Sequence, residues 1–233
     1  MEELKRAAAR EAVDRYVRSG MVVGLGTGTT ASWAVRRIGE RLMEGSLSGV
    51  RGVPTSEYTA ALARECGVPL VSLSECRPEL TIDGADEIAP DLSVIKGRGG
   101  ALLREKIVAA ASRRGVVIVA DGSKQVSLLG NGPLPVEVEP FGWEATAEAL
   151  ASLGCTPELR RVKTQPFVTD GGHYTLDCRF PGIPDPATLA CRIKRVPGAL
   201  ECGLFVGLAR AAVIARQEGV EVLVAEPPSS CPR

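Results

Sequence analysis

The fold is decided by a stretch near the amino terminus, Met21-Val22-Val23-Gly24-Leu25-Gly26-Thr27-Gly28-Thr29-Thr30. It begins with a short apolar run, which is typical of a strand buried in a parallel sheet. Glycines and threonines follow, and residues 31–43 have helical periodicity. A strand, a glycine-rich loop and a helix in this order direct backbone N–H groups and the helix dipole toward an anion. The stretch therefore indicates an α/β fold with a phosphate site, and an ordinary βα turn is the alternative.

A dinucleotide site is the main competitor for this loop, and the sequence departs from its pattern twice. Thr29 stands where the third glycine of the dinucleotide fingerprint belongs. The next strand, Val50-Arg51-Gly52-Val53, runs into Pro54-Thr55-Ser56 and offers no acid to hold a ribose. A single phosphate fits the loop better.

Strands and helices alternate through the first 130 residues. Helices are expected over 2–18, 31–43, 57–66 and 101–113, and further strands over 69–71, 80–82, 91–95 and 116–120. Short loops between them predict a Rossmann-like, mostly parallel sheet with helices on both faces. Three polar, glycine-rich loops directly follow strand ends, and ligands bind at that edge of an open α/β sheet.

Composition changes after the loop Gly130-Asn131-Gly132-Pro133-Leu134-Pro135. The following pattern predicts strands over 136–138, 174–180 and 199–205, helices over 143–153 and 185–195, and a hairpin through Asp170-Gly171-Gly172. This order matches a small ferredoxin-like α+β unit. The first domain is expected to resume with a helix around 211–214 and a strand over 220–224, before a disordered tail over 226–233. We thus predict a catalytic α/β domain of residues 1–132 and 206–233, and an oligomerisation domain of residues 133–205.

Composition excludes several classes of function. Lys and Arg total 28, as do Asp and Glu, so the chain lacks the basic excess of a nucleic-acid or membrane-surface protein. No signal peptide or span of ~18 apolar residues is visible. The seven cysteines are scattered without a C-x-x-C pair, which favours reduced thiols in a cytoplasmic protein. His173 is the only histidine, which excludes a histidine-rich metal centre and allows a Ser-His-Asp triad only around that residue. Its sequence predicts a hairpin turn, so acid–base chemistry is expected to fall to carboxylates and lysine.

Candidate acid–base residues gather between Thr81 and Lys106. Asp83 and Asp86 lie in Thr81-Ile82-Asp83-Gly84-Ala85-Asp86-Glu87-Ile88, and Lys96 precedes the glycine-rich Gly97-Arg98-Gly99-Gly100. Such a cluster beside glycine-rich backbone suggests proton transfer on a small polar substrate. A turn built by the two aspartates and a structural ion pair for Lys96 are the simpler alternatives. Lys124, after an apolar strand, suits an anion contact or solvent.

Glu105 is the candidate base. Its neighbours one helical turn away are Ala101, Leu102, Val108 and Ala109, so the surrounding helix face is apolar. A carboxylate there is either shielded by a partner or raised in pKa, and a general base needs a raised pKa. The alternative is an exposed charged turn, Arg104-Glu105-Lys106.

Several blocks of sequence resemble the signature of the type A ribose-5-phosphate isomerases. The blocks run in order from residue 24 to residue 199: Gly24-Leu25-Gly26-Thr27-Gly28-Thr29-Thr30-Ala31, Asp83-Gly84-Ala85-Asp86-Glu87-Ile88, Ile95-Lys96-Gly97-Arg98-Gly99-Gly100-Ala101-Leu102-Leu103-Arg104-Glu105-Lys106, Ala120-Asp121-Gly122-Ser123-Lys124-Gln125-Val126, Leu134-Pro135-Val136-Glu137-Val138, Phe167-Val168-Thr169-Asp170 and Val196-Pro197-Gly198-Ala199. The resemblance extends over nearly the whole chain, and several ordered blocks are far more specific than any one.

This resemblance implies a set of roles. Thr27, Gly28, Thr29 and Thr30 would cradle the substrate phosphate with help from Lys124, while Asp83, Gly84, Ala85, Asp86, Lys96, Gly97, Arg98 and Gly99 would line the sugar. Glu105 would move a proton between C1 and C2 through an enediolate. The family needs no cofactor or metal and forms homodimers or homotetramers. Arg98 stands where many relatives have glycine, and either Lys5 or Arg6 would approach the substrate.

The sequence therefore predicts a cytoplasmic homo-oligomer that interconverts D-ribose 5-phosphate and D-ribulose 5-phosphate in the pentose phosphate pathway. A non-catalytic domain that senses sugar phosphates is the first alternative, although residues 1–20 are too short for a helix-turn-helix segment. Another sugar-phosphate enzyme on the same fold, a deaminase or lactonase, is the second, and the catalytic histidines expected of those are missing.

Overall fold

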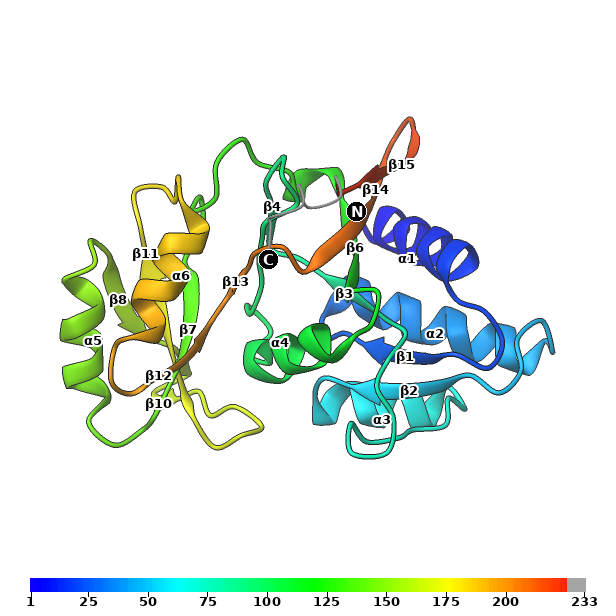
Figure 1. Ribbon diagram of the computed structural model, residues 1–233, viewed down its shortest axis with the longest axis horizontal. Coiled ribbons are helices and arrows are strands. Elements are labelled where there is room, and N and C mark those ends of the chain that lie inside the picture. Colours follow the sequence, from blue (N-terminus) through cyan, green and yellow to red (C-terminus); the bar gives the residue numbers. More distant parts are fainter. Residues whose placement is uncertain (226–233) are drawn as a thin grey trace, which may run out of the picture.

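The computed structural model describes residues 1–225, whose two largest sheets lie on opposite sides of a central helix (Figure 1). The helices are α1 (Glu2–Tyr16), α2 (Thr29–Met43), α3 (Glu57–Glu65), α4 (Leu102–Ala111), the short 3-10 helix η1 (Gly122–Lys124), α5 (Trp143–Ala151) and α6 (Pro186–Lys194). The strands are β1 (Val22–Leu25), β2 (Arg51–Pro54), β3 (Leu80–Gly84), β4 (Glu87–Ile88), β5 (Val94–Ile95), β6 (Val116–Asp121), β7 (Leu134–Val138), β8 (Thr156–Leu159), β9 (Arg161–Val162), β10 (Gln165–Pro166), β11 (Tyr174–Arg179), β12 (Ala199–Cys202), β13 (Leu204–Phe205), β14 (Ala209–Arg216) and β15 (Gly219–Val224).

The larger sheet has six strands in the order β15-β14-β6-β3-β1-β2. All neighbouring pairs are parallel except the hairpin of β14 and β15. Strands β1 and β6 are buried along their whole length, as expected for continuous apolar runs covered on both faces. The carboxyl ends of β1, β3 and β6 therefore meet at one edge of the sheet.

Different elements cover the two faces of this sheet. Helices α1 and α2 pack on one face, against side chains that include Leu25, Ile82 and Val119. Residues from α4 and from the three-stranded sheet β13-β5-β4 pack on the other face, against Ile118 and Ile214. The predicted α/β layering is confirmed, and α4 is placed between the two sheets (Figure 1).

The smaller sheet has the antiparallel order β12-β7-β11-β8, which is the ferredoxin-like arrangement. Alternate side chains of a strand point to opposite faces. Leu134, Val136 and Leu176 accordingly join the apolar cluster under α5 and α6. Glu137 and Asp177 have the opposite register and lie on the other face of the sheet.

Residues 211–214 are not a helix, and that prediction is wrong. They belong to β14, which pairs in parallel with β6 and antiparallel with β15. The run Ala211 to Ala215 is buried on every side, and an all-buried segment has no periodicity that separates helix from strand.

Two further predictions differ in detail, and a third is not tested. The strand expected over 69–71 is reduced to one bridge between Leu70 and Gly52. The strand expected over 199–205 divides at Gly203 into β12 and β13, because β13 leaves the small sheet to pair with β5. The tail over 226–233 lies outside the described residues.

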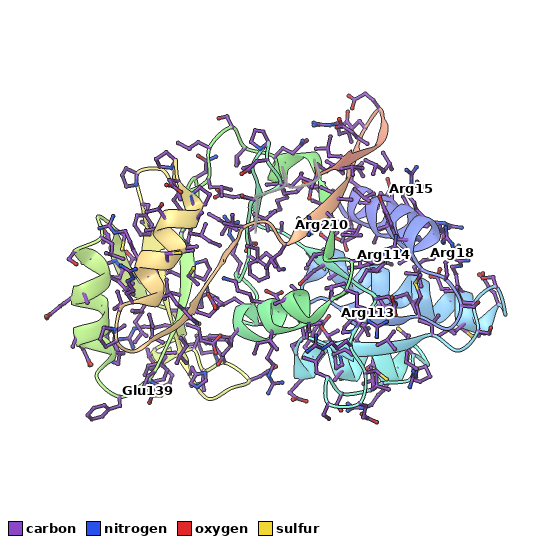
Figure 2. The ribbon with its side chains drawn as sticks, in the orientation of Figure 1. Arg15, Arg18, Arg113, Arg114, Glu139 and Arg210 are labelled. Carbon is purple, nitrogen blue, oxygen red and sulfur yellow. The ribbon has the colours of Figure 1, made fainter. Side chains whose placement is uncertain are left out.

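Basic side chains gather at the amino edge of the large sheet, away from the carboxyl ends of β1 and β3. Figure 2 shows Arg113 and Arg114 beyond the end of α4, and Arg210 at the start of β14. Arg113 pairs with Glu79 at 3.2 Å.

Within residues 1–225 no helix is long and apolar enough to cross a membrane.

Candidate active site

A cavity of about 110 Å³ lies at the carboxyl edge of the large sheet. It is lined by Lys5, Thr27, Gly28, Thr29, Thr30, Gly84, Ala85, Asp86, Lys96, Gly97, Arg98, Gly99, Glu105 and Lys124. Asp83 lies beneath this lining, bonded to Lys96. The structure thus brings every candidate site residue to one place. A larger cavity of about 520 Å³ between α3 and α4 contains none of them, so chemistry rather than size identifies the site.

Lys96 is the centre of a buried ionic cluster. Its Nζ lies 3.0 Å from Oδ2 of Asp83 and 3.2 Å from Oε1 of Glu105, and it donates a hydrogen bond of 2.7 Å to the carbonyl of Gly84. All three charged residues are at most 3% exposed. Burial alone would lower the pKa of the Lys96 ammonium, but Asp83 and Glu105 outweigh burial and raise that pKa. Lys96 therefore stays protonated and neutralises one carboxylate.

Burial raises the pKa of both carboxyl groups in this cluster, Asp83 and Glu105. Burial, followed by the charge of Asp83, raises the pKa of Glu105 to about 8 against the opposing effect of Lys96. Among the described residues nothing donates a hydrogen bond to its Oε2, which is buried. Glu105 lines the pocket, and a carboxyl group with a pKa near neutrality and an unpartnered oxygen is suited to accept and return a proton.

The close approach of two strands places Asp83 under the pocket. A Cβ on Gly26, just beyond the end of β1, would lie only 2.1 Å from Oδ1 of Asp83. Glycine is therefore required there for a steric reason. Asp83 belongs to β3 rather than to a tight turn, and its Oδ1 accepts a hydrogen bond of 2.8 Å from the N–H of Gly84.

The opposite end of the pocket is built around the start of α2. Gly28 precedes the helix and has a φ of 122°. Because glycine has no side chain, the N–H groups of the first turn have no side-chain cap. Thr29 and Thr30 add hydroxyl groups there, and Lys5 donates a hydrogen bond of 3.0 Å to Oγ1 of Thr29. This arrangement of N–H groups, hydroxyls and a lysine suits a phosphate.

The hydroxyl group of Thr27, unlike those of Thr29 and Thr30, belongs to a cluster of hydroxyl groups beside α3. Its Oγ1 lies 2.7 Å from Oγ1 of Thr55, 2.8 Å from Oγ of Ser56 and 3.0 Å from Oγ1 of Thr59. Ser56 caps α3, where its side chain accepts a hydrogen bond from the N–H of Thr59. The hydroxyl cluster fixes the loop before α2. Only the position of Thr55 and Ser56 after β2, at the same sheet edge, could have indicated it from sequence.

The structure separates the alternatives for Lys5, Arg6 and Arg98. Lys5 lines the pocket, whereas the guanidinium of Arg6 is stacked on Trp33, 5.6 Å from the ring centre. Arg98 lines the rim, where its half-exposed side chain lies 3.8 Å from Asp86 and its N–H donates to the same carboxylate. Lys124 lines the pocket from η1.

Two polar residues of the sequence serve structure rather than the pocket. Buried Glu87 accepts hydrogen bonds from the N–H groups of Gly130 and Gly132, and thereby fixes the loop that leads into the smaller sheet. His173 lies 2.9 Å from the carboxylate of Glu137 and does not line the pocket. Within residues 1–225 no group of three or more His, Cys, Asp or Glu side chains could hold a metal ion.

The chain is similar to known proteins over nearly its whole length. Residues 51–219 match the family model of ribose 5-phosphate isomerase A, also called phosphoriboisomerase A. Ribose-5-phosphate isomerase A of Gloeobacter violaceus is 55% identical, with 100% of this chain and 99% of that protein aligned. The Nitrobacter hamburgensis protein of the same name is 50% identical over 96% of this chain and 98% of its own.

Solved structures agree with this. The ribose 5-phosphate isomerase of Plasmodium falciparum superposes with a TM-score of 0.93 at 40% identity, covering 96% of this chain and 99% of its own. A D-ribose-5-phosphate isomerase solved with phospho-erythronic acid superposes with a TM-score of 0.92 at 37% identity, covering 96% and 98%. By these matches in sequence and structure, this chain belongs to the ribose-5-phosphate isomerase A family of aldose–ketose isomerases.

Proposed function

We propose that Glu105 is the base of this isomerase. In open-chain ribose 5-phosphate its carboxylate takes the proton from C2, which leaves an enediolate. It then returns the proton to C1, while the hydroxyl proton of O2 passes to O1, and the product is ribulose 5-phosphate. Lys96 stabilises the negative charge on the enediolate oxygens. Asp83 holds Lys96 in place, and Asp86 accepts hydrogen bonds from sugar hydroxyls, with the backbone of Gly84, Ala85 and residues 97–99 lining the sugar.

One observation carries this proposal: buried Lys96 is shared between Asp83 and Glu105, and Glu105 keeps one oxygen without a partner among the described residues. An ion pair built only for stability would satisfy both oxygens, because a buried polar atom without a hydrogen bond costs roughly 1–3 kcal/mol. Glu105 is one of the residues that line the cavity, so a substrate carbon can approach its carboxyl group there.

At the other end, the residues from Thr27 to Thr30 hold the phosphate, assisted by Lys5 and Lys124. A structural relative was solved in complex with phospho-erythronic acid, which supports a pocket for a phosphorylated, sugar-like ligand. Phospho-erythronic acid is a phosphorylated four-carbon sugar acid, and its carboxylate resembles a planar enediolate. Phosphate binding far from the reacting carbons can be used to orient them.

A paired measurement tests these roles. Wild type incubated with ribose 5-phosphate and EDTA should form ketose, followed directly by absorbance. Glu105→Gln should lower kcat by at least about 10³-fold, within the range for loss of a general base. Its affinity for ribose 5-phosphate, measured by calorimetry, should change less than about threefold.

Glu201→Gln is the control, because Glu201, like Glu105, is a carboxylate paired with a lysine, here Lys106 at 2.9 Å, but it is only partly buried and lies outside the pocket. We expect its kcat to match wild type. Normal turnover by Glu105→Gln would remove Glu105 as the base.

We also propose that the chain acts as a cytoplasmic homodimer or homotetramer, with residues 1–132 and 206–233 as the catalytic domain and residues 133–205 as the oligomerisation domain. Separate apolar clusters under α1 and α2 and under α5 and α6 support two domains. The six cysteines of residues 1–225 are free thiols, which suits a reducing compartment. Sedimentation of the purified chain measures its oligomeric state.

A further inference from the structure

The loop between Lys96 and Gly100 is bonded to the smaller sheet as well as to its own domain. Nη1 of Arg160, which follows β8, donates hydrogen bonds of 2.9 Å to the carbonyl of Gly97 and 3.1 Å to that of Arg98. Both carbonyls belong to residues that line the catalytic cavity. Arg160 lies 63 positions after Gly97 and does not line the cavity itself, yet it contacts the sugar-binding backbone.

Arg160 is itself held in a single orientation. Its Nε donates a hydrogen bond of 2.9 Å to Oδ2 of Asp177, and its Nη2 bonds to Oδ1 of the same carboxylate. This paired geometry fixes the plane of the guanidinium as well as its position. Asp177 belongs to β11 and lies on the face of the small sheet that is not covered by α5 and α6. The side chains of Arg160 and Asp177 are 15% and 21% exposed, so water screens the pair only partly.

A second contact presses on the same loop. Gly100 has a φ of 77°, and a Cβ there would lie 2.3 Å from Cζ of Phe167, so the Phe167 ring lies directly against the glycine. The guanidinium of Arg160 is 5.8 Å from the centre of that ring. The N–H of Phe167 donates to the carbonyl of Arg160 at 2.9 Å, which joins the two contacts into one unit.

These bonds fix which groups of the loop face the substrate. The carbonyl of Gly97 accepts from both Arg160 and the N–H of Gly100. The N–H of Arg98 donates to Asp86. Within residues 1–225 the N–H groups of Gly97 and Gly99 donate to no acceptor. Arg160 therefore holds the carbonyl side of the loop and leaves N–H donors for the sugar.

We propose that Arg160, oriented by Asp177, is a positioning residue of the isomerisation: it fixes the loop from Gly97 to Gly100, and through that loop the sugar beside Glu105. The proposal rests on the roles given above to Glu105 and Lys96. It makes the smaller domain a contributor to turnover as well as to assembly. A misplacement of about 1 Å in a positioning group can cost about 10²-fold in rate, so the effect is measurable.

The test uses the full-length chain with Arg160→Ala, Arg160→Lys, Asp177→Asn and the double variant Arg160→Ala with Asp177→Asn. We expect Arg160→Ala to lower kcat about 10- to 100-fold, because the loop no longer holds the sugar in register. Arg160→Lys should recover part of this loss, since an ammonium can reach one carbonyl but cannot form the paired contact with Asp177. Asp177→Asn should lower kcat about 3- to 10-fold, because it loosens the guanidinium without removing it.

Two readouts separate positioning from a purely structural bond. Inhibition by inorganic phosphate should keep its wild-type constant in every variant, because the phosphate cradle belongs to the larger domain. The double variant should be no slower than Arg160→Ala, because Asp177 acts only through Arg160. Arg161→Ala is the matched control: the neighbouring arginine is exposed and donates only to the carbonyl of Thr164, so its kinetics should match wild type.

The proposal is overturned if folded Arg160→Ala has a kcat within about twofold of wild type. It is also overturned if the loss of kcat in the double variant equals the product of the losses in Arg160→Ala and Asp177→Asn. Should Arg160→Ala not fold, unchanged kcat in both Arg160→Lys and Asp177→Asn overturns it equally. Glu105→Gln assayed in parallel keeps the two proposals apart. An inactive Glu105→Gln with a normal Arg160→Ala refutes only the positioning role, whereas an active Glu105→Gln refutes the catalytic site.

Discussion

The two ends of the pocket recognise negative charge by opposite means. At the sugar end, Asp83, Lys96 and Glu105 are charged groups removed from water, and each depends on the other two. At the phosphate end, residues 27–30 supply backbone N–H groups and hydroxyls, and the lysines there remain partly exposed. With the roles proposed above, the difference teaches that chemistry and binding are separated in this fold. Buried charges would tune a proton, whereas N–H groups, hydroxyls and partly exposed lysines would hold a phosphate whose charge does not change during the reaction.

Burial makes the sugar end sensitive to any single change. Removing one member of a buried ion pair commonly costs about 3–5 kcal/mol, because the remaining charge has no partner. A hydroxyl that donates to a solvated phosphate contributes only about 0.5–1.5 kcal/mol. Substitutions at the two ends should therefore differ in size and in the kinetic constant that they affect.

The largest effect is expected for Lys96→Met. It removes the cation from the enediolate oxygens and leaves two buried carboxylates together, so kcat should fall by about 10³-fold or more. The free energy of unfolding should fall by about 3–5 kcal/mol. Lys106→Met is the control, because Lys106 also pairs with a carboxylate but lies outside the pocket. It should lose stability without losing kcat, and equal kcat losses in both variants would argue against a catalytic Lys96.

The next effect concerns pH. Because the pKa of Glu105 is raised from 4.5 to about 8, the folded chain keeps a proton that the unfolded chain releases. Glu105 thus contributes stability that is fully present below pH 4.5 and is lost as pH rises through about 8. Catalytic activity depends on pH in the opposite direction, because the base must be ionised. We therefore expect kcat/KM to rise up to about pH 8 and then to level off.

Comparison with Glu105→Gln isolates this contribution. The free energy of unfolding of the variant minus that of wild type should increase between about pH 5 and pH 8, by at most about 1.4 kcal/mol per pH unit. Chemical denaturation at a series of pH values measures it. A difference that stays constant over this range would mean that Glu105 does not carry the shifted proton.

The smallest effect is expected at the phosphate end. Thr29→Ala combined with Thr30→Ala removes two hydroxyl donors but leaves the N–H groups of α2 in place. KM for ribose 5-phosphate should rise about 10- to 30-fold, in line with two hydrogen bonds. Binding of unphosphorylated ribose should not change. Ser32→Ala on the same helix is the control, because its hydroxyl bonds to the carbonyl of Gly28 rather than lining the pocket. Equal weakening for both sugars would contradict a phosphate cradle at this helix.

Local patterns predicted much of the fold and most of the site. Strand β1, its glycine loop and α2 could be predicted because a buried strand, a loop and a helix each have a distinct composition. The prediction for residues 211–214 was wrong because a strand buried between β6 and β15 has no alternation of polar and apolar side chains. The burial of Glu105 followed from its apolar neighbours along the helix.

Contacts between distant segments could not be predicted from the chain. Lys5 and Arg6 are adjacent and both basic, and only the packing of α1 on α2 directs Lys5 to Thr29 and Arg6 to Trp33. Arg160 has no motif around it, and its role depends on a carbonyl 63 residues earlier in the chain. Such contacts are set by the relative placement of the two sheets, which no local pattern encodes.

The open face of the ferredoxin-like sheet limits how freely that unit can be exchanged between proteins. Glu201 on β12 bonds to Lys106 of α4, and Asp170 in the loop before β11 contacts Arg104 of the same helix. A foreign unit without acids at the matching positions would leave Lys106 and Arg104 of α4 without their carboxylate partners. Grafting should therefore succeed only when α4 and the acids opposite it are transplanted as a set.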